Sequence, residues 1–217
     1  MDLMALFELA APVMLRATCY TLLFAVSAMV LGLALGGLVA FVRVLQVPVL
    51  DRVAAVYVSA MRGTPLLVQV FIVYYGLPSI GIEFSPVTAG ILALTLNVAA
   101  YLSESLRGAV MGVAEGQWMA GTSLGLTRLQ SLRYVVMPQA LRSAVPALSN
   151  SLISLIKDTS LVSVIAVTEL MLATKELIST TFQPFPLYLA AAAIYWALSA
   201  SFERVQRMLE RKLAFPH

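Results

Sequence analysis

The sequence predicts an all-α membrane protein built as a five-span transmembrane helical bundle. Hydrophobic residues make up 60% of the 217 residues and charged residues only 12%, against about 25% charged residues in an ordinary soluble domain. Long apolar runs recur along the chain, whereas strands of a transmembrane barrel alternate apolar and polar residues. Because a chain in lipid must satisfy its own backbone hydrogen bonds, we expect each run to be helical.

Each run is long enough to cross a hydrocarbon core of about 30 Å, which takes roughly 20 helical residues. The first run contains no charged residue, and the fourth is interrupted by Lys157 and Asp158. We therefore expect a single transmembrane domain over residues 1–217, with spans at about 17–42, 53–82, 84–106, 140–168 and 184–207 and a cytoplasmic loop at about 107–139.

The basic residues predict the orientation of these spans. With the amino terminus outside and the carboxyl terminus in the cytoplasm, the outer side keeps only Arg16 and Lys175. The positive-inside rule favours this arrangement. The first ten residues contain no lysine or arginine, so we expect no cleavable signal peptide. The basic residues that fall inside are Arg43, Arg52, Arg62, Arg107, Arg128, Arg133, Arg142, Arg204, Arg207, Arg211 and Lys212.

Few residues are available for metal, redox or phosphate chemistry. Cys19 is the single cysteine and His217 the single histidine, so the sequence predicts no metal site and no internal disulfide. No lysine follows a glycine in the pattern of a phosphate-binding loop. We therefore expect no catalytic residues, no bound cofactor and no ATP hydrolysis by this chain alone.

Residues 121–125 fit the G-x-S-x-G pattern of serine hydrolases, with Ser123 in the nucleophile position. A serine nucleophile needs a base within hydrogen-bond reach, and the one histidine stands at the last position. An intramembrane hydrolase is therefore the least favoured alternative.

The polar loop itself has a readable local structure. Residues 117–124 have helical character, and Gly125 stands where a left-handed cap would end that helix. Thr127 and Gln130 form a capping box for a second helix. We expect that second helix to run to residue 137 and to end at Pro138.

Gly125 is followed after nine residues by the segment 135–138, Val-Val-Met-Pro, which resembles the EAA loop of ABC importer permeases. Gly116, Gln117 and Trp118 resemble the lead-in to that loop in the branch for polar amino acids, which includes histidine, glutamate, glutamine, arginine, cystine and opine systems. Further blocks that resemble this branch lie at 62–69, 74–78 and 157–161.

The resemblance implies the type I permease fold of ABC importers in a bacterial cytoplasmic membrane. It implies a permease subunit that works as a homo- or heterodimer, with an extracytoplasmic solute-binding protein and two ATPase subunits that hold ATP and Mg²⁺. The substrate would be a polar amino acid, with a cystine-like solute as a finer possibility. A small channel or ion-coupled carrier without an ATPase is the alternative.

By the same resemblance, residues 117–124 form the helix that couples the permease to the ATPase. Met119 stands where the motif has Glu, and Gly121 where it has its second Ala. We hypothesise that docking here depends on shape and apolar contact instead of that carboxylate. The implied coupling residues are Gln117, Trp118, Met119, Ala120, Gly121, Gly125, Leu126 and Pro138.

Two polar stripes at helical spacing predict a solute pathway. Asn150, Ser154 and Asp158 recur every four residues, and Asn97, Tyr101 and Glu104 recur on the third span. Such residues usually face a partner or a water-filled cavity, so interhelical hydrogen bonds are the structural alternative. The candidate pathway residues are Asn97, Glu104, Asp158, Thr159, Ser160 and Arg62.

Small residues also recur every four positions in the first span, at Ala28, Gly32, Gly36 and Ala40. Such a stripe permits close approach of another helix. From the sequence, packing within the chain and contact with a second subunit both remain open.

Overall fold

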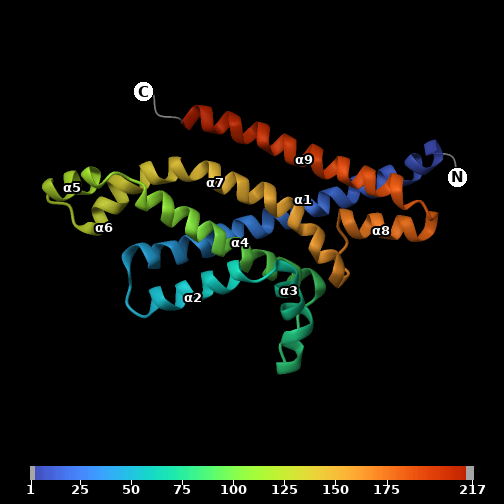
Figure 1. Cartoon of the computed structure of the whole chain (residues 1–217), viewed down its shortest axis with the longest axis horizontal. Helices are drawn as coiled ribbons and strands as arrows, with labels where there is room; N and C mark the ends of the chain where they lie inside the picture. The colour runs from blue at the N-terminus through green and yellow to red at the C-terminus, as the bar shows by residue number, and fades with distance from the viewer. Residues whose placement is uncertain (1–2, 214–217) are drawn as a thin grey trace.

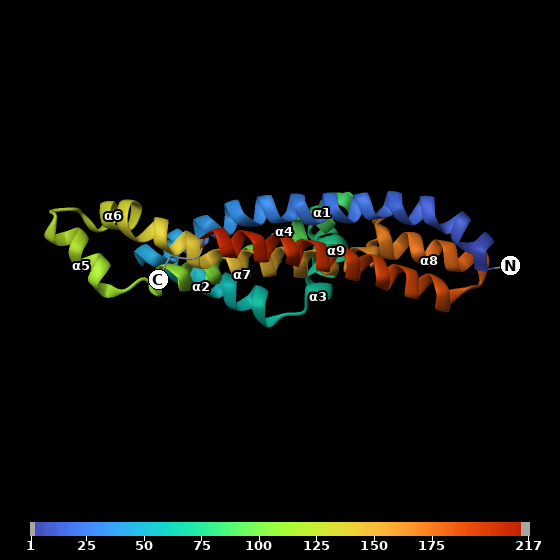
Figure 2. The same cartoon turned by 90° about the horizontal axis from the view of Figure 1, so that it is seen from above.

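The computed structural model describes residues 3–213, and every regular element in this range is helical. The helix α1 (Leu3–Leu45) runs along most of the molecule, and α4 (Pro86–Met111) packs beside it (Figure 1). The helices α7 (Met137–Asp158) and α9 (Pro184–Leu213) complete an elongated bundle (Figure 2). The prediction of an all-helical fold is confirmed.

Three of the described helices are long and apolar enough to cross a membrane, namely α1, α4 and α9. A fourth candidate is the pair Leu50–Gly63 and Leu66–Ile80, which is bent by 109°. The helix α7 does not belong to this set; its sequence includes Arg142, Pro146 and Asn150. The structure therefore supports three or four spans, and the count of five is not confirmed.

The helix α1 begins well before the expected boundary at residue 17. Its first turns have an apolar face of their own, on which Leu6, Ala10 and Met14 are buried against Leu170 and Leu187. These two leucines belong to α8 (Leu170–Thr181) and α9. Burial of this face provides a hydrophobic reason for the helix to continue to its amino-terminal end.

The small-residue stripe of α1 packs against α4 within the chain. A Cβ added at Gly36 would lie 2.7 Å from the carbonyl oxygen of Ala99, and one added at Gly32 would lie 2.5 Å from Cγ1 of Val98. Ala28 is fully buried in the same core. The sequence left open whether this stripe packs within the chain or against a second subunit. Gly32 and Gly36 pack within the chain.

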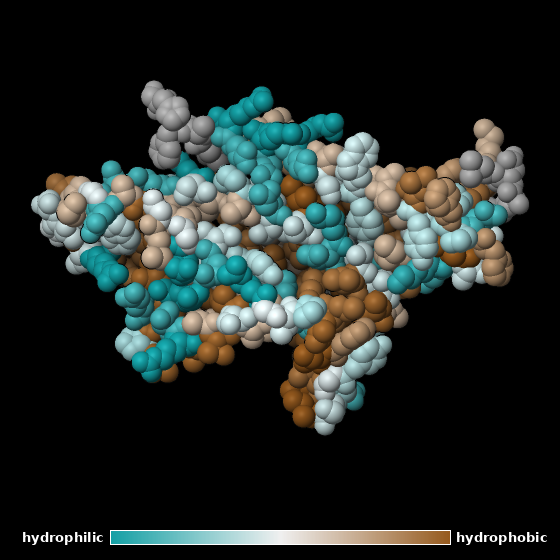
Figure 3. Space-filling model, in the orientation of Figure 1, coloured by the Kyte–Doolittle hydropathy of each residue, from teal (hydrophilic) through white to brown (hydrophobic). Residues whose placement is uncertain are grey.

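The second predicted span is broken at Pro65. The helix α2 (Leu50–Gly63) ends there because Thr64, which precedes proline, adopts an extended conformation. The chain resumes as α3 (Leu66–Phe71), a π-helix η1 (Ile72–Gly76) and a 3₁₀ helix η2 (Leu77–Ile80). These three elements form an apolar arm that projects from the bundle (Figure 3).

The polar loop forms α5 (Glu115–Ser123), followed by Gly125 in the left-handed conformation with φ +79°. The predicted capping box is present: Thr127 Oγ1 accepts from the backbone N–H of Gln130, and Gln130 Oε1 accepts from that of Thr127. These contacts begin the short helix α6 (Arg128–Ser131).

The expectation that Pro138 ends the second loop helix is wrong. A π-helix η3 (Leu132–Val136) follows α6 and passes directly into α7, with Pro138 in the first turn of α7. Proline lacks an N–H donor and crowds the carbonyl four residues before it. The wider π turn changes the hydrogen-bond pattern directly before Pro138. The chain therefore remains helical through Pro138.

The helix α7 ends at Asp158, and the chain tightens into the 3₁₀ helix η4 (Thr159–Ile165). Ala166 then takes a left-handed conformation with φ 58°, after which α8 and α9 follow. The fourth predicted span, 140–168, is therefore an α-helix joined to a 3₁₀ segment. The break falls at the polar pair Lys157 and Asp158, where the sequence interrupts the apolar run.

Candidate functional site

A cavity of about 510 Å³ lies between the break after α2, the middle of α4 and the second half of α7. Its polar wall joins the two stripes predicted from the sequence. The α4 stripe contributes Asn97 and Tyr101, and the α7 stripe contributes Asn150, Ser154 and Asp158. Spacing by three or four residues places side chains of one helix on a common face, so two facing stripes can line one cavity.

Asn97 also belongs to the hydrogen-bond network that closes the bend after α2. Its Nδ2 donates to the carbonyl oxygen of Met61 at 3.3 Å and to Oε1 of Gln69 at 3.1 Å. Gln69 Nε2 in turn donates to the carbonyl oxygens of Met61 at 2.8 Å and Thr64 at 3.1 Å. These bonds satisfy carbonyl groups that the broken helix leaves without partners.

Gln69 is a structural residue of this site that the sequence reasoning missed. It is buried, with 6% of its surface exposed, in an otherwise apolar helix. A buried polar side chain needs hydrogen-bond partners, and the carbonyl groups exposed by Pro65 supply them. A glutamine shortly after a proline in an apolar run is the signal that could have indicated this role.

Thr159 and Ser160 do not line the cavity. Thr159 is fully buried and its Oγ1 donates to the carbonyl oxygen of Ile156 at 2.7 Å. Ser160 Oγ donates to the carbonyl oxygen of Lys157, also at 2.7 Å. Both hydroxyls thus cap the end of α7, where the change to a 3₁₀ helix leaves carbonyl groups to be satisfied.

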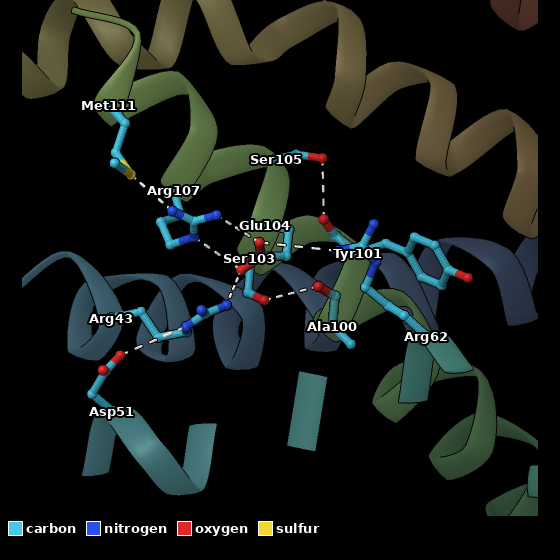
Figure 4. Close-up of polar contacts among 10 residues, drawn as sticks. All are labelled: Arg43, Asp51, Arg62, Ala100, Tyr101, Ser103, Glu104, Ser105, Arg107 and Met111. Atoms are coloured by element: carbon cyan, nitrogen blue, oxygen red, sulfur yellow. Dashed lines mark hydrogen bonds and ion pairs between the residues drawn. The ribbon is translucent and has the colours of Figure 1, made fainter. Parts of the chain in front are cut away.

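Glu104 lies away from the cavity, in a cluster of charged residues (Figure 4). It pairs with Arg43 of α1 and with Arg107, whose Nη2 lies 2.8 Å from Oε2. Arg43 Nε also lies 3.7 Å from Oδ1 of Asp51 in α2. With only 18% of its side chain exposed, Glu104 connects α1 and α4 in a setting that screens the charges less than open water does.

Arg62 lies between the charged cluster and the cavity. Its guanidinium carbon is 5.4 Å from the ring centroid of Tyr101, and its Nη1 is 4.0 Å from Oε2 of Glu104. Tyr101 lines the cavity. Arg62 therefore contacts a cavity residue without lining the cavity itself.

The helix α5 presents a partly apolar surface, with one exposed acidic residue, Glu115, in its first turn. Met119 is 59% exposed and Leu124 is 80% exposed, and Gln117 and Ala120 are exposed beside them. Trp118 packs inward on a cluster that includes Leu132. Exposed apolar side chains on a short helix are typical of a docking surface.

Gly121 and Gly125 shape the end of α5. A Cβ added at Gly121 would lie 2.6 Å from Oγ of Ser131, so glycine permits α5 to approach α6 closely. Beyond it, the N–H of Leu126 donates to the carbonyl oxygen of Gly121 at 3.1 Å. This bond, together with the left-handed Gly125, is the Schellman type of helix ending.

Residues 28–215 match the family described as "Binding-protein-dependent transport system inner membrane component". The chain belongs to this family. The inner-membrane component is a transport subunit of an ABC importer and not an enzyme, and the ATPase is a separate subunit. Family membership therefore decides against the serine hydrolase with Ser123 and against a carrier without an ATPase.

Similar proteins support the same assignment. The L-cystine transport system permease protein TcyB of Bacillus subtilis is 40% identical over 203 residues, covering 93% of this chain and 87% of that protein. The glutamine transport system permease protein GlnP of Escherichia coli (strain K12) is 36% identical over 206 residues, covering 94% of each.

Among solved structures, the crystal structure of an amino acid ABC transporter with histidines has a TM-score of 0.93 at 32% identity and covers 98% of this chain and 99% of that one. The MetNI methionine ABC transporter, at 18% identity, has a TM-score of 0.76 and shows the fold alone. The type I permease fold of ABC importers is thus confirmed for this inner-membrane component.

Proposed function

We propose that this permease passes a polar amino acid from an extracytoplasmic solute-binding protein to the cytoplasm through the cavity between α4 and α7. The observation that carries the proposal is the presence of Asn97 and Asp158 on the walls of one cavity. Two similar proteins, a cystine permease and a glutamine permease, agree with it. A cystine-like solute is our finer proposal.

The acceptors in the cavity suit the ammonium group of an amino acid. Asp158 supplies a carboxylate. Asn97 uses its Nδ2 for Met61 and Gln69, so its Oδ1 remains as an acceptor for a solute. An ammonium group carries three donors, and these two oxygen-bearing side chains can receive two of them.

The carboxylate of the solute needs donors. Thr159 and Ser160 were candidate pathway residues, but their hydroxyls donate to backbone carbonyl groups at the end of α7. We propose that Ser154 and Asn150, which line the cavity, donate to the carboxylate instead. Arg62 adds positive charge beside the cavity.

Replacing Asp158 with asparagine tests this function. We expect Asp158→Asn to lower solute affinity about tenfold, because a charge-assisted hydrogen bond contributes about 1.5–3 kcal/mol. Uptake of labelled cystine and glutamine by the assembled importer measures the effect. The matched control is Glu83→Gln, at an exposed position outside the cavity. Unchanged uptake by Asp158→Asn, with normal assembly, contradicts the proposal.

We further propose that two permease subunits, identical or of two related kinds, form the pathway. Each docks through α5 on one of two ATPase subunits, which bind ATP and Mg²⁺, while this chain holds no cofactor. Closure of the ATPase pair moves the loop helix and the spans attached to it as rigid bodies. In this proposal the chain keeps five spans, with the amino terminus outside and the carboxyl terminus in the cytoplasm.

A further inference from the structure

A second polar cavity, of about 360 Å³, lies where α1 and α4 end next to the polar loop. Its wall combines Arg43 from the last turns of α1, Arg107 from α4 and Arg128 from α6, together with Trp118 of α5. None of these residues lines the first cavity. We call it the Arg128 cavity.

The guanidinium groups of the Arg128 cavity have donors without good acceptors. Arg43 Nε is buried and makes no hydrogen bond within the described chain. Arg107 Nη1 donates to the sulfur of Met111 at 2.8 Å, and a thioether is a weak acceptor. The guanidinium group of Arg128 has no hydrogen bond or ion pair within residues 3–213. Of these donors only Arg43 Nε is buried, because Arg128 is an exposed residue. Leaving a buried donor unpaired costs free energy, so this wall favours an oxygen-rich ligand.

The charges around the cavity do not balance. The cavity wall carries three guanidinium groups, those of Arg43, Arg107 and Arg128, and one carboxylate, that of Asp51. Glu104 pairs with Arg43 and Arg107 beside the wall, and it also lies 4.0 Å from Arg62. Positive charges therefore outnumber negative ones around the cavity, which favours an anionic ligand. Arginine is well suited to phosphate because its planar fork can donate two parallel hydrogen bonds.

The position of the cavity indicates where such a phosphate would come from. It lies at the ends of two apolar helices that are long enough to cross a membrane, which is the level of the lipid headgroups. Basic pockets between membrane helices on the cytoplasmic side are typical sites for anionic headgroups. We propose that the Arg128 cavity binds the phosphate of an anionic phospholipid, a chemistry that a soluble phosphate ester shares.

A phosphate in this cavity contacts both the span ends and the loop that contains α5. Arg43 and Arg107 belong to the bundle, whereas Trp118 and Arg128 belong to the loop that contains α5. The bound headgroup therefore fixes the loop relative to the span ends. This consequence rests on the proposed coupling role of α5, but binding of the phosphate does not.

Trp118 provides a direct measurement of binding. The chain has two tryptophans, so the full-length protein with Trp196→Phe reports on Trp118 alone. In detergent, we expect short-chain phosphatidylglycerol to change the emission of Trp118 in a saturable way, and phosphatidylcholine of equal chain length to have no effect. Glycerol phosphate is the second probe. A response to the lipid alone assigns the site to the membrane, and an equal response to glycerol phosphate assigns it to a soluble ester.

Variants at Arg128 separate specific binding from a general charge effect. We expect Arg128→Gln to weaken phosphatidylglycerol binding about tenfold, because one charge-assisted hydrogen bond is lost, and Arg128→Lys to weaken it less. Arg133→Gln removes the same charge from an exposed residue of the same loop outside the cavity and should bind like the parent. No response to either probe, or equal loss in Arg128→Gln and Arg133→Gln, overturns the proposal. Because emission requires no transport, this result is independent of the uptake experiment.

Discussion

Asn97 combines structural and chemical roles in one side chain. Its amide nitrogen holds the bend after α2, and its amide oxygen remains available to the cavity. Gln69 completes the same network from α3. The shape of the cavity therefore depends on the hydrogen bonds that compensate for a broken helix.

Gly36 allows α1 to approach the backbone of α4 closely. We expect Gly36→Val to destabilise the protein by about 1–3 kcal/mol, because overpacking forces side chains and backbone to shift. The obstacle is the carbonyl oxygen of Ala99, which belongs to a helix and cannot move alone. Thermal unfolding of the purified protein in detergent measures the loss.

The neighbouring residue provides the control. An added Cβ at Gly37 meets no atom within 4 Å in the described chain. Gly37→Val therefore adds the same side chain to the same helix without a clash. Equal melting temperatures for the Gly36→Val and Gly37→Val variants contradict this account of the packing.

The sequence was informative for residues on regular helices. Spacing alone predicted that Asn150, Ser154 and Asp158 share a face, because helical geometry fixes that relation, and the structure places all three on one cavity. Thr159 and Ser160 follow directly, but the change to a 3₁₀ helix redirects them. Their roles as solute contacts stay a prediction, and so does that of Glu104.

At the scale of elements, α5 is the clearest match between pattern and structure. Its helical character, the left-handed Gly125 and the capping box of Thr127 were all predicted and are all present. These are local features that depend on neighbouring residues only. The prediction that Pro138 ends the second loop helix was wrong. The π turn that accommodates this proline has no comparable local signal in the sequence.

Met119 is the least typical residue of α5, and substitutions at this position test how α5 docks. If docking depends on apolar contact, Met119→Ala should lower ATPase activity stimulated by the loaded binding protein about tenfold or more, since burying a methionine contributes about 1.5–3 kcal/mol. Met119→Glu, which restores the residue of the EAA motif, should lower it further because a carboxylate enters an apolar contact.

The assembled importer, purified with its ATPase, is the system for this measurement. Ser123→Ala, at the exposed end of α5, is the control for a general effect of substitution. Full activity in Met119→Ala would contradict the apolar hypothesis. Higher activity in Met119→Glu would show that a carboxylate contact suits this helix.

For the whole molecule, the fold class was predictable and the number of spans was not. Composition and apolar runs suffice for an all-helical membrane protein, since they sum over many residues. The polar character of α7 is already present in its sequence, which includes Arg142, Pro146 and Asn150. The bend of 109° at Pro65 instead depends on how helices assemble around a cavity. A hydropathy argument treats each run alone and does not contain that information.

The proposed topology places Glu83 outside and Leu124 inside. In a Cys19→Ser background, we expect a membrane-impermeant maleimide to label Glu83→Cys in intact cells, because both positions are exposed and the outer one faces the reagent. Leu124→Cys should be labelled only after the membrane is opened. Labelling of Leu124→Cys in intact cells, with protection of Glu83→Cys, would reverse the orientation derived from the positive-inside rule.

The length of α1 has a mechanical consequence. From residue 13 to Leu45 the helix contains no proline, and this stretch is about 50 Å long at 1.5 Å per residue. One end packs on α8 and α9, and the other carries Arg43 into the charged cluster. Treated as a stiff rod, it converts a tilt of about 5° at one end into a displacement of about 4 Å at the other. A small rotation of α1 at the end that packs on α8 and α9 therefore displaces the ion pairs beside the coupling loop.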